Sequence, residues 1–159
     1  MKLCVVTILF VLTVMVSGGV ASDENPCNGT WHLNLEKSKA PGGRLPHPIS
    51  INIIKIEGDT MTLIADHTDT AGKWEHVEYH AKLDGKPYPV KSDPPGPEPY
   101  TISLKDTDAR TREFVEVLGT FTISGRDILS EDGKTFSRVV EFKDQQGNDA
   151  SIIQFFEKQ

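Results

Sequence analysis

The residue types best suited to chemistry in this chain are histidine and glutamate, which gather in the segment 74–83. His76 and His80 are four residues apart, with Glu78 between them, and imidazole and carboxylate groups are common zinc ligands. On a strand, however, residues four apart are separated by about 13 Å. One ion cannot bridge that distance. We therefore expect these side chains on a solvated outer face, and we predict no metal site and no cofactor.

Sequence motifs of common catalytic sites are missing. The chain has no Gly-x-Ser-x-Gly, His-Glu-x-x-His, Cys-x-x-Cys or phosphate-binding glycine loop. Cys27 stands next to Asp23 and Glu24, and acidic neighbours raise a thiol pKa instead of activating it. The sequence favours a protein without catalysis, and an enzyme built on the same fold stays open as a third alternative.

A better candidate site consists of aromatic and long apolar residues on segments with alternating polarity. Arg138 shares one strand face with Phe136, Val140 and Phe142, so it could orient an acidic ligand inside a barrel. A shift of one residue in the register would place it outside instead. The aromatic residues could also simply fill the core. The candidate ligand-binding residues are Tyr79, Phe114, Val117, Phe121, Phe136, Arg138, Phe142 and Phe156.

Nine or ten short segments with a period of two carry these residues. Turn signals such as Glu57-Gly58-Asp59 and 130–134 separate them, and no segment shows the 3.6-residue period of a helix. The pattern predicts an all-β fold: a single closed antiparallel up-and-down β-barrel of about 8–10 strands.

Two local features refine this prediction. Ile51 and Ile53 fall on one strand face but Ile54 and Ile56 on the other, which predicts a bulge near Ile53. The stretches Ala40–Pro48 and Ser92–Pro99 are rich in proline and glycine and are predicted to be loops.

The N-terminus indicates export. Lys2 is followed by an apolar run to Val16 and by Gly19-Val20-Ala21, which is the pattern of a cleavable signal peptide over residues 1–21. We expect a short N-terminal segment, 22–28, and one barrel domain, 29–159. Cleavage removes Lys2 and no acidic residue, so the net charge changes from −6 to −7. That charge disfavours nucleic acid as a partner, and no later run is long enough to span a bilayer.

Asn28-Gly29-Thr30 is an acceptor triplet for N-glycosylation. It matters only in a eukaryotic secretory pathway. Asn28 is therefore a candidate glycosylation site.

Both ends of the barrel segment resemble lipocalins and fatty-acid-binding proteins, the calycin superfamily. Gly29-Thr30-Trp31 is similar to their Gly-x-Trp signature, and Phe155–Lys158 resembles the closing strand of fatty-acid-binding proteins. The resemblance implies a ligand-holding barrel in which an inward arginine, here Arg138, could stack on Trp31. The chain departs from the family where Gln154-Phe155-Phe156 replaces the Arg-x-Tyr pair that grips a lipid carboxylate.

A second resemblance covers nearly the whole chain after residue 28. It is to a group of uncharacterised secreted lipocalin-like proteins, and it rests on Gly29–Lys39, Glu78–Val90, Ser130–Thr135 and Glu157–Gln159. The group implies the same barrel and the same export, but it carries no activity.

Together these observations predict a secreted barrel, extracellular or, in a bacterium, periplasmic, that binds a small apolar or amphipathic ligand. The alternative is an extracellular protein-interaction module with a filled barrel, whose contact surface would be the loops Ala40–Pro48 and Ser92–Pro99. The sequence does not indicate an oligomeric state.

Overall fold

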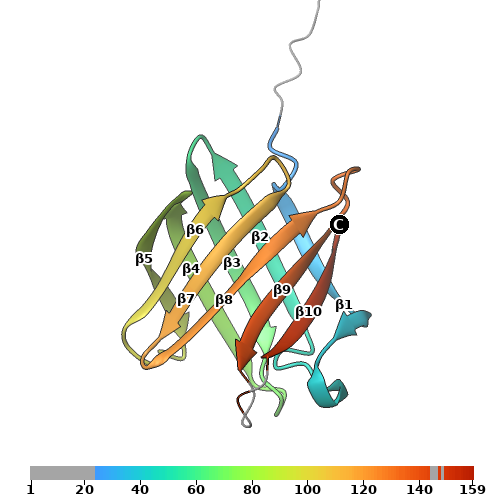
Figure 1. The fold of residues 1–159 in the computed structure, drawn as a ribbon, viewed down its shortest axis with the longest axis vertical. Helices are drawn as coiled ribbons and strands as arrows, with labels where there is room; N and C mark the ends of the chain where they lie inside the picture. Colours follow the sequence, from blue (N-terminus) through green and yellow to red (C-terminus); the bar gives the residue numbers. More distant parts are fainter. Residues whose placement is uncertain (1–23, 144–146, 148) are drawn as a thin grey trace, which may run out of the picture.

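The computed structural model describes residues 24–143, 147 and 149–159, so the predicted signal peptide lies outside the described residues. In these described residues ten β-strands make up almost all of the fold, and one 3₁₀ turn, η1 (Pro41–Gly43), follows the first strand (Figure 1). The strands are β1 (Gly29–Lys39), β2 (Ser50–Glu57), β3 (Thr60–Thr68), β4 (Trp74–Lys82), β5 (Asp84–Asp93), β6 (Tyr100–Asp106), β7 (Thr111–Leu118), β8 (Phe121–Leu129), β9 (Thr135–Lys143) and β10 (Asp149–Lys158).

The strands form one closed antiparallel barrel in chain order. Each strand pairs with the next, and β1 closes the circle by pairing with both β2 and β10. In the closing ladder Trp31 lies opposite Lys158 and Leu33 opposite Phe156. This architecture confirms the fold class expected from the alternating pattern, and closure leaves no sheet edge exposed.

Alternation of side chains decides which residues face the interior. Along β3, Met61, Leu63 and Ala65 are buried, and the residues between them are only partly covered. β2 follows the same rule without interruption, because Ser50 and Asn52 face inward together with Ile54 and Ile56.

The predicted bulge near Ile53 is therefore wrong. β2 pairs with β3 in an unbroken register, and Ile53 is 46% exposed on the outside. The irregularity lies in β1, whose register against β10 shifts between Asn34 and Lys39. There the Ser38 hydroxyl accepts a hydrogen bond from the Phe155 amide at 2.9 Å.

The strand β5 is longer than predicted, since it includes Ser92 and Asp93, which the sequence assigned to the loop Ser92–Pro99.

The two ends of the barrel differ (Figure 1). The upper end carries residue 24, where the described chain begins, the C-terminus, and the β2–β3, β6–β7 and β8–β9 turns. The lower end carries the long connection after β1 and the β3–β4, β5–β6 and β7–β8 connections. Within the described residues, no helix is long and apolar enough to cross a bilayer.

Aromatic residues pack tightly near the upper end. Trp31 is fully buried, and its indole N–H donates to the Cys27 carbonyl at 2.9 Å. Its ring meets the edge of Phe136 at a centroid distance of 4.9 Å, and Phe136 stacks on Phe156 at 4.5 Å. Lys158, and not Arg138, lies over the Trp31 ring, at 5.3 Å. The stacking of Arg138 on Trp31 that the lipocalin resemblance implied is therefore wrong.

Gly125 allows β8 to pack closely against its neighbours. A Cβ atom there would lie 2.1 Å from the Val139 carbonyl oxygen and 2.7 Å from the Phe114 ring. Backbone atoms cannot move away cheaply, so no larger residue fits without shifting β8.

We predict that Gly125→Ala destabilises the barrel by about 1–3 kcal/mol through overpacking. Ser124→Ala, one residue away on the exposed face, should change the free energy of unfolding by less than about 0.5 kcal/mol. Urea denaturation of both variants measures the difference. Equal stability would contradict the close packing described here.

Candidate functional site

The barrel encloses a cavity of about 820 Å³. This volume lies within the range of about 300–1,000 Å³ that is typical of small-molecule sites. Pro46, Pro94 and Pro97 of the lower-end connections and Phe121 at the start of β8 are among its lining residues, so the mouth lies at the lower end. The interior is therefore hollow, whereas one alternative from the sequence was a filled core.

Most of the cavity wall is apolar. Inward-facing aliphatic and aromatic side chains from six strands line it, namely Leu63, Ala65, Val77, Ile102, Phe114, Val140, Ile152 and Phe156. Polar groups enter at a few points. On β2 the Ser50 hydroxyl donates to Asn52 Oδ1 at 3.3 Å, and on β10 the buried Gln154 faces the same space. Such a wall suits a ligand that is mainly apolar and carries a few polar atoms.

An ion pair holds the one arginine that lines this cavity. Arg138 on β9 donates from Nε and Nη2 to the two carboxylate oxygens of Asp127 on β8, at 2.8 and 2.9 Å. Its guanidinium lies 4.9 Å from the centre of the Phe114 ring. Burial alone would lower the pKa of Arg138, but the charge and hydrogen bonds of Asp127 together with smaller contributions outweigh it, and the pKa is raised. Arg138 is therefore a permanent cation with donors left for a ligand.

Two tyrosines add hydrogen-bond donors to the wall. Burial, with a smaller contribution from Asp127, raises the pKa of Tyr79, although the charge of Arg138 opposes this. Burial and then the negative charge of Glu116 raise the pKa of Tyr100. Both hydroxyls are thus protonated at neutral pH and can donate. Glu116 lines the same cavity and offers an acceptor.

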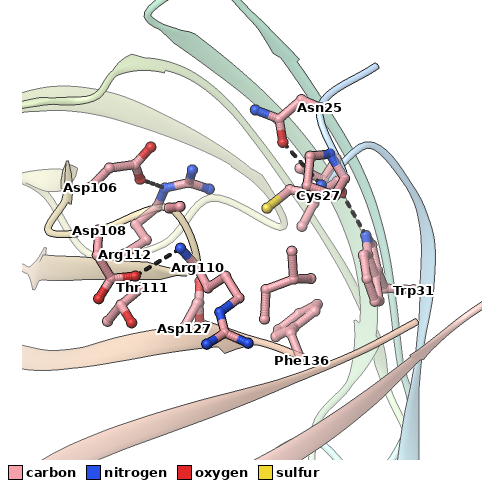
Figure 2. Close-up of a pocket in the computed structure, with 14 residues that line it drawn as sticks. Asn25, Cys27, Trp31, Asp106, Asp108, Arg110, Thr111, Arg112, Asp127 and Phe136 are labelled. Carbon is pink, nitrogen blue, oxygen red and sulfur yellow. Dashed lines mark hydrogen bonds and ion pairs between the residues drawn. The ribbon is translucent and has the colours of Figure 1, made fainter. Parts of the chain in front are cut away.

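A second, much smaller pocket of about 80 Å³ lies at the upper end (Figure 2). Arg112 donates from Nε to Asp106 at 2.7 Å there, and the Cys27 sulfur points into the space. Burial raises the pKa of the Cys27 thiol, with Arg112 opposing the effect. A protonated thiol is a poor nucleophile, and the pocket volume is well below the range of about 300–1,000 Å³ typical of small-molecule sites.

The structure brings most of the predicted site residues together. Tyr79, Phe114, Phe121, Arg138, Phe142 and Phe156 line the large cavity. Phe121 is 73% exposed, because it begins β8 at the rim.

Two predicted residues lie elsewhere. Val117 does not line the cavity, since successive residues point to opposite faces and its neighbours Glu116 and Leu118 point inward. Phe136 lines the small upper pocket instead. It forms the floor between the two spaces with Phe156, on which it stacks.

The sequence reasoning missed three residues at the mouth: His47, His67 and Glu75. The alternation of side chains could have indicated two of them, since His67 continues the inward face of Leu63 and Ala65 on β3 and Glu75 that of Val77 and Tyr79 on β4. Burial, and then the proximity of His47, lower the pKa of His67, while Glu75 opposes this.

The outer histidines do lie on the solvated face. His76 contacts Asp66 at 2.7 Å and His80 contacts Glu78 at 3.2 Å. Their side chains are 45% and 62% exposed, respectively. The two pairs use separate carboxylates.

The Asn28 side chain continues the hydrogen bonding between β1 and β2 beyond Gly29. Its Oδ1 accepts from the Ile56 amide at 2.6 Å, and its Nδ2 donates to the Ile56 carbonyl at 3.4 Å. The side chain therefore extends the sheet at the upper end. Glycosylation of Asn28 stays a prediction.

Solved structures with a similar fold support the architecture. One mutant of the fluorescent protein UnaG has a TM-score of 0.59 and 10% sequence identity, with 84% of this chain and 96% of that chain covered. A second UnaG mutant has a TM-score of 0.53 and 12% identity, with 82% and 94% covered. No protein-family model and no curated protein matches the chain. At these identities the likeness shows the fold alone, which is a closed antiparallel barrel.

Proposed function

We propose that this protein is a secreted barrel that binds one small apolar or amphipathic molecule and performs no catalysis. The observation that carries the proposal is the cavity of about 820 Å³ inside a closed barrel. A protein interior is normally packed to the density of an organic crystal. An empty space of this size with an apolar wall lowers the stability of the fold unless a ligand fills it.

The arrangement of polar groups favours an amphipathic ligand. Arg138, Tyr79 and Tyr100 supply donors and Glu116 supplies an acceptor, and all four line a wall that is otherwise mainly apolar. Because Asp127 already balances the charge of Arg138, the site does not require a fully ionised ligand. A neutral molecule with polar substituents can also bind, although the free donors of the Arg138 cation favour an acid.

The loops at the mouth fit a role in ligand entry. The alternative function, an interaction module, used the stretches Ala40–Pro48 and Ser92–Pro99 as a contact surface above a filled barrel. Here Pro46 and His47 of the first stretch and Pro94 and Pro97 of the second border a hollow interior. A rim that controls access to the cavity accounts for both loops.

Export rests on the N-terminal residues 1–21, whose composition is that of a signal peptide. The resemblance to secreted lipocalin-like proteins points the same way. We propose an extracellular location, or a periplasmic one in a bacterium.

We predict that the protein binds a fluorescent apolar probe at one site per chain. Ala65→Trp should abolish this binding, because Ala65 is buried in the cavity wall and the indole would occupy the space. Ile53→Trp places the same ring on the outer surface of β2 and should bind like the parent. Fluorescence titration gives the stoichiometry and affinity. An absence of saturable binding, or equal binding by both variants, would contradict the proposal.

We predict that Arg138 selects acidic over neutral ligands. In the double variant Arg138→Met/Asp127→Asn, which removes both charges of the pair, the preference for a long-chain carboxylic acid over its alcohol should fall about tenfold or more. The control is Arg126→Met, whose guanidinium is exposed beside Glu141. Calorimetry with both ligands measures the ratio. An unchanged ratio would remove Arg138 from the recognition of acids.

We predict that the exported protein begins at Ser22, the residue after Ala21. Expression of the full sequence in a secreting host, followed by N-terminal sequencing of the medium or periplasm, tests this. Recovery of protein that retains Met1 would reject a cleaved signal peptide.

A further inference from the structure

Three potential metal ligands converge at the mouth of the cavity. His47 comes from the connection between β1 and β2, His67 from the end of β3 and Glu75 from the start of β4. One ligand atom of each residue lies within 4.8 Å of the corresponding atoms of the other two. In the described part of the chain, no other group of three His, Cys, Asp or Glu residues is gathered in this way.

The register of β3 and β4 fixes two of the ligands. His67 and Glu75 are direct partners across the ladder, and His67 Nε2 lies 3.2 Å from Glu75 Oε2. Zinc binds histidine nitrogen and carboxylate oxygen at about 2.0–2.2 Å, so two ligands of one tetrahedral ion are separated by about 3.4 Å. The pair is therefore already spaced for a shared ion.

A backbone hydrogen bond orients the third ligand. His47 Nδ1 lies 3.2 Å from the Thr68 carbonyl oxygen, and because a carbonyl only accepts, Nδ1 must donate. His47 Nε2 is then left with a lone pair. Metal-binding histidines characteristically make this kind of outer hydrogen bond through the ring nitrogen that does not bind the ion. The His47 and His67 ring centroids are 4.0 Å apart, so both imidazoles border the same small space.

The burial of His67 distinguishes this cluster from the outer histidine pairs. The side chain of His67 is 14% exposed and that of Glu75 is 34% exposed. Two imidazoles and a carboxylate held together, with His67 largely buried, match the composition of zinc sites with three protein ligands. Calcium and magnesium prefer sets made of oxygen atoms, which these residues do not provide.

We propose that His47, His67 and Glu75 form a binding site for a divalent transition-metal ion of the zinc class at the mouth of the cavity. Three protein ligands leave at least one coordination position open. Because all three residues line the large cavity, that position faces the cavity. The site stands apart from the proposed function, because it needs no small-molecule ligand.

The experiment titrates protein expressed from the full sequence, without a polyhistidine tag, with Co²⁺ and then Zn²⁺. We expect one Co²⁺ per chain, visible d–d absorption of a site with nitrogen and oxygen ligands, and displacement by Zn²⁺ at a dissociation constant of about 10 μM or tighter. His47→Ala, His67→Ala and Glu75→Ala should each weaken binding about tenfold or more. Each should also remove the absorption band.

The matched control is His76→Ala. His76 also contacts a carboxylate, that of Asp66, but on the exposed face and without a third ligand, so its loss should leave the metal affinity unchanged. Circular dichroism and the metal-free melting temperature report whether each variant folds. If an alanine variant fails to fold, Glu75→Gln, which keeps the side-chain shape, gives the affinity loss instead.

The proposal is overturned if no saturable binding occurs below about 100 μM Co²⁺ or Zn²⁺. It is also overturned if folded His67→Ala binds like the parent, or if His76→Ala abolishes binding. Probe binding in the cavity is measured separately with metal-free protein. A failure of probe binding and a failure of metal binding are thus distinguishable results.

Discussion

The ladder between β1 and β10 is the constraint on which the rest of the structure depends. Each of the other strands pairs with its chain neighbours, but β1 and β10 meet from opposite ends of the sequence, with Trp31 opposite Lys158. Without this ladder the ten strands would form an open sheet with two unpaired edges. With it they enclose a space, and every inward side chain becomes part of one wall. The cavity, its rim and the convergence of His47, His67 and Glu75 all follow from this closure.

Side chains of β8, β9 and β10 divide the interior into two unequal parts. Phe136 stacks on Phe156, and Arg138 is paired with Asp127. Phe136 and Asp127 border the small upper pocket, whereas Phe156 and Arg138 border the large cavity. The aromatic stack and the ion pair thus form a floor. This floor leaves the lower end as the open side, where loops with functional side chains can gather.

The sequence predicted the barrel well because alternation along a strand is a local property. The assignment of inward faces was correct for β4, where Val77 and Tyr79 are buried. It failed for β2, since Asn52 is a buried polar residue beside a cavity, and hydrophobicity alone does not identify such a position. The predicted bulge near Ile53 came from that error.

The candidate site was harder to predict than the fold. The alternation of side chains along β3 and β4 could have placed His67 and Glu75 on the inner face. It could not place His47, because this residue lies in the long connection between β1 and β2, which returns to the barrel mouth. It also could not show that Arg138 is balanced by Asp127, since that pairing depends on the register between β8 and β9. Long-range register and loop paths are set by the whole barrel, so a single strand does not reveal them.

The central claim, that the hollow interior holds the ligand, is tested most directly by nuclear magnetic resonance with a bound apolar ligand. Leu63, Ile102 and Val140 line the cavity, whereas Ile53, Val115 and Ile128 are exposed on the outer surface. Nuclear Overhauser contacts from the ligand to the methyl groups of the first three are the predicted result. Contacts confined to the methyl groups of the outer three would contradict it.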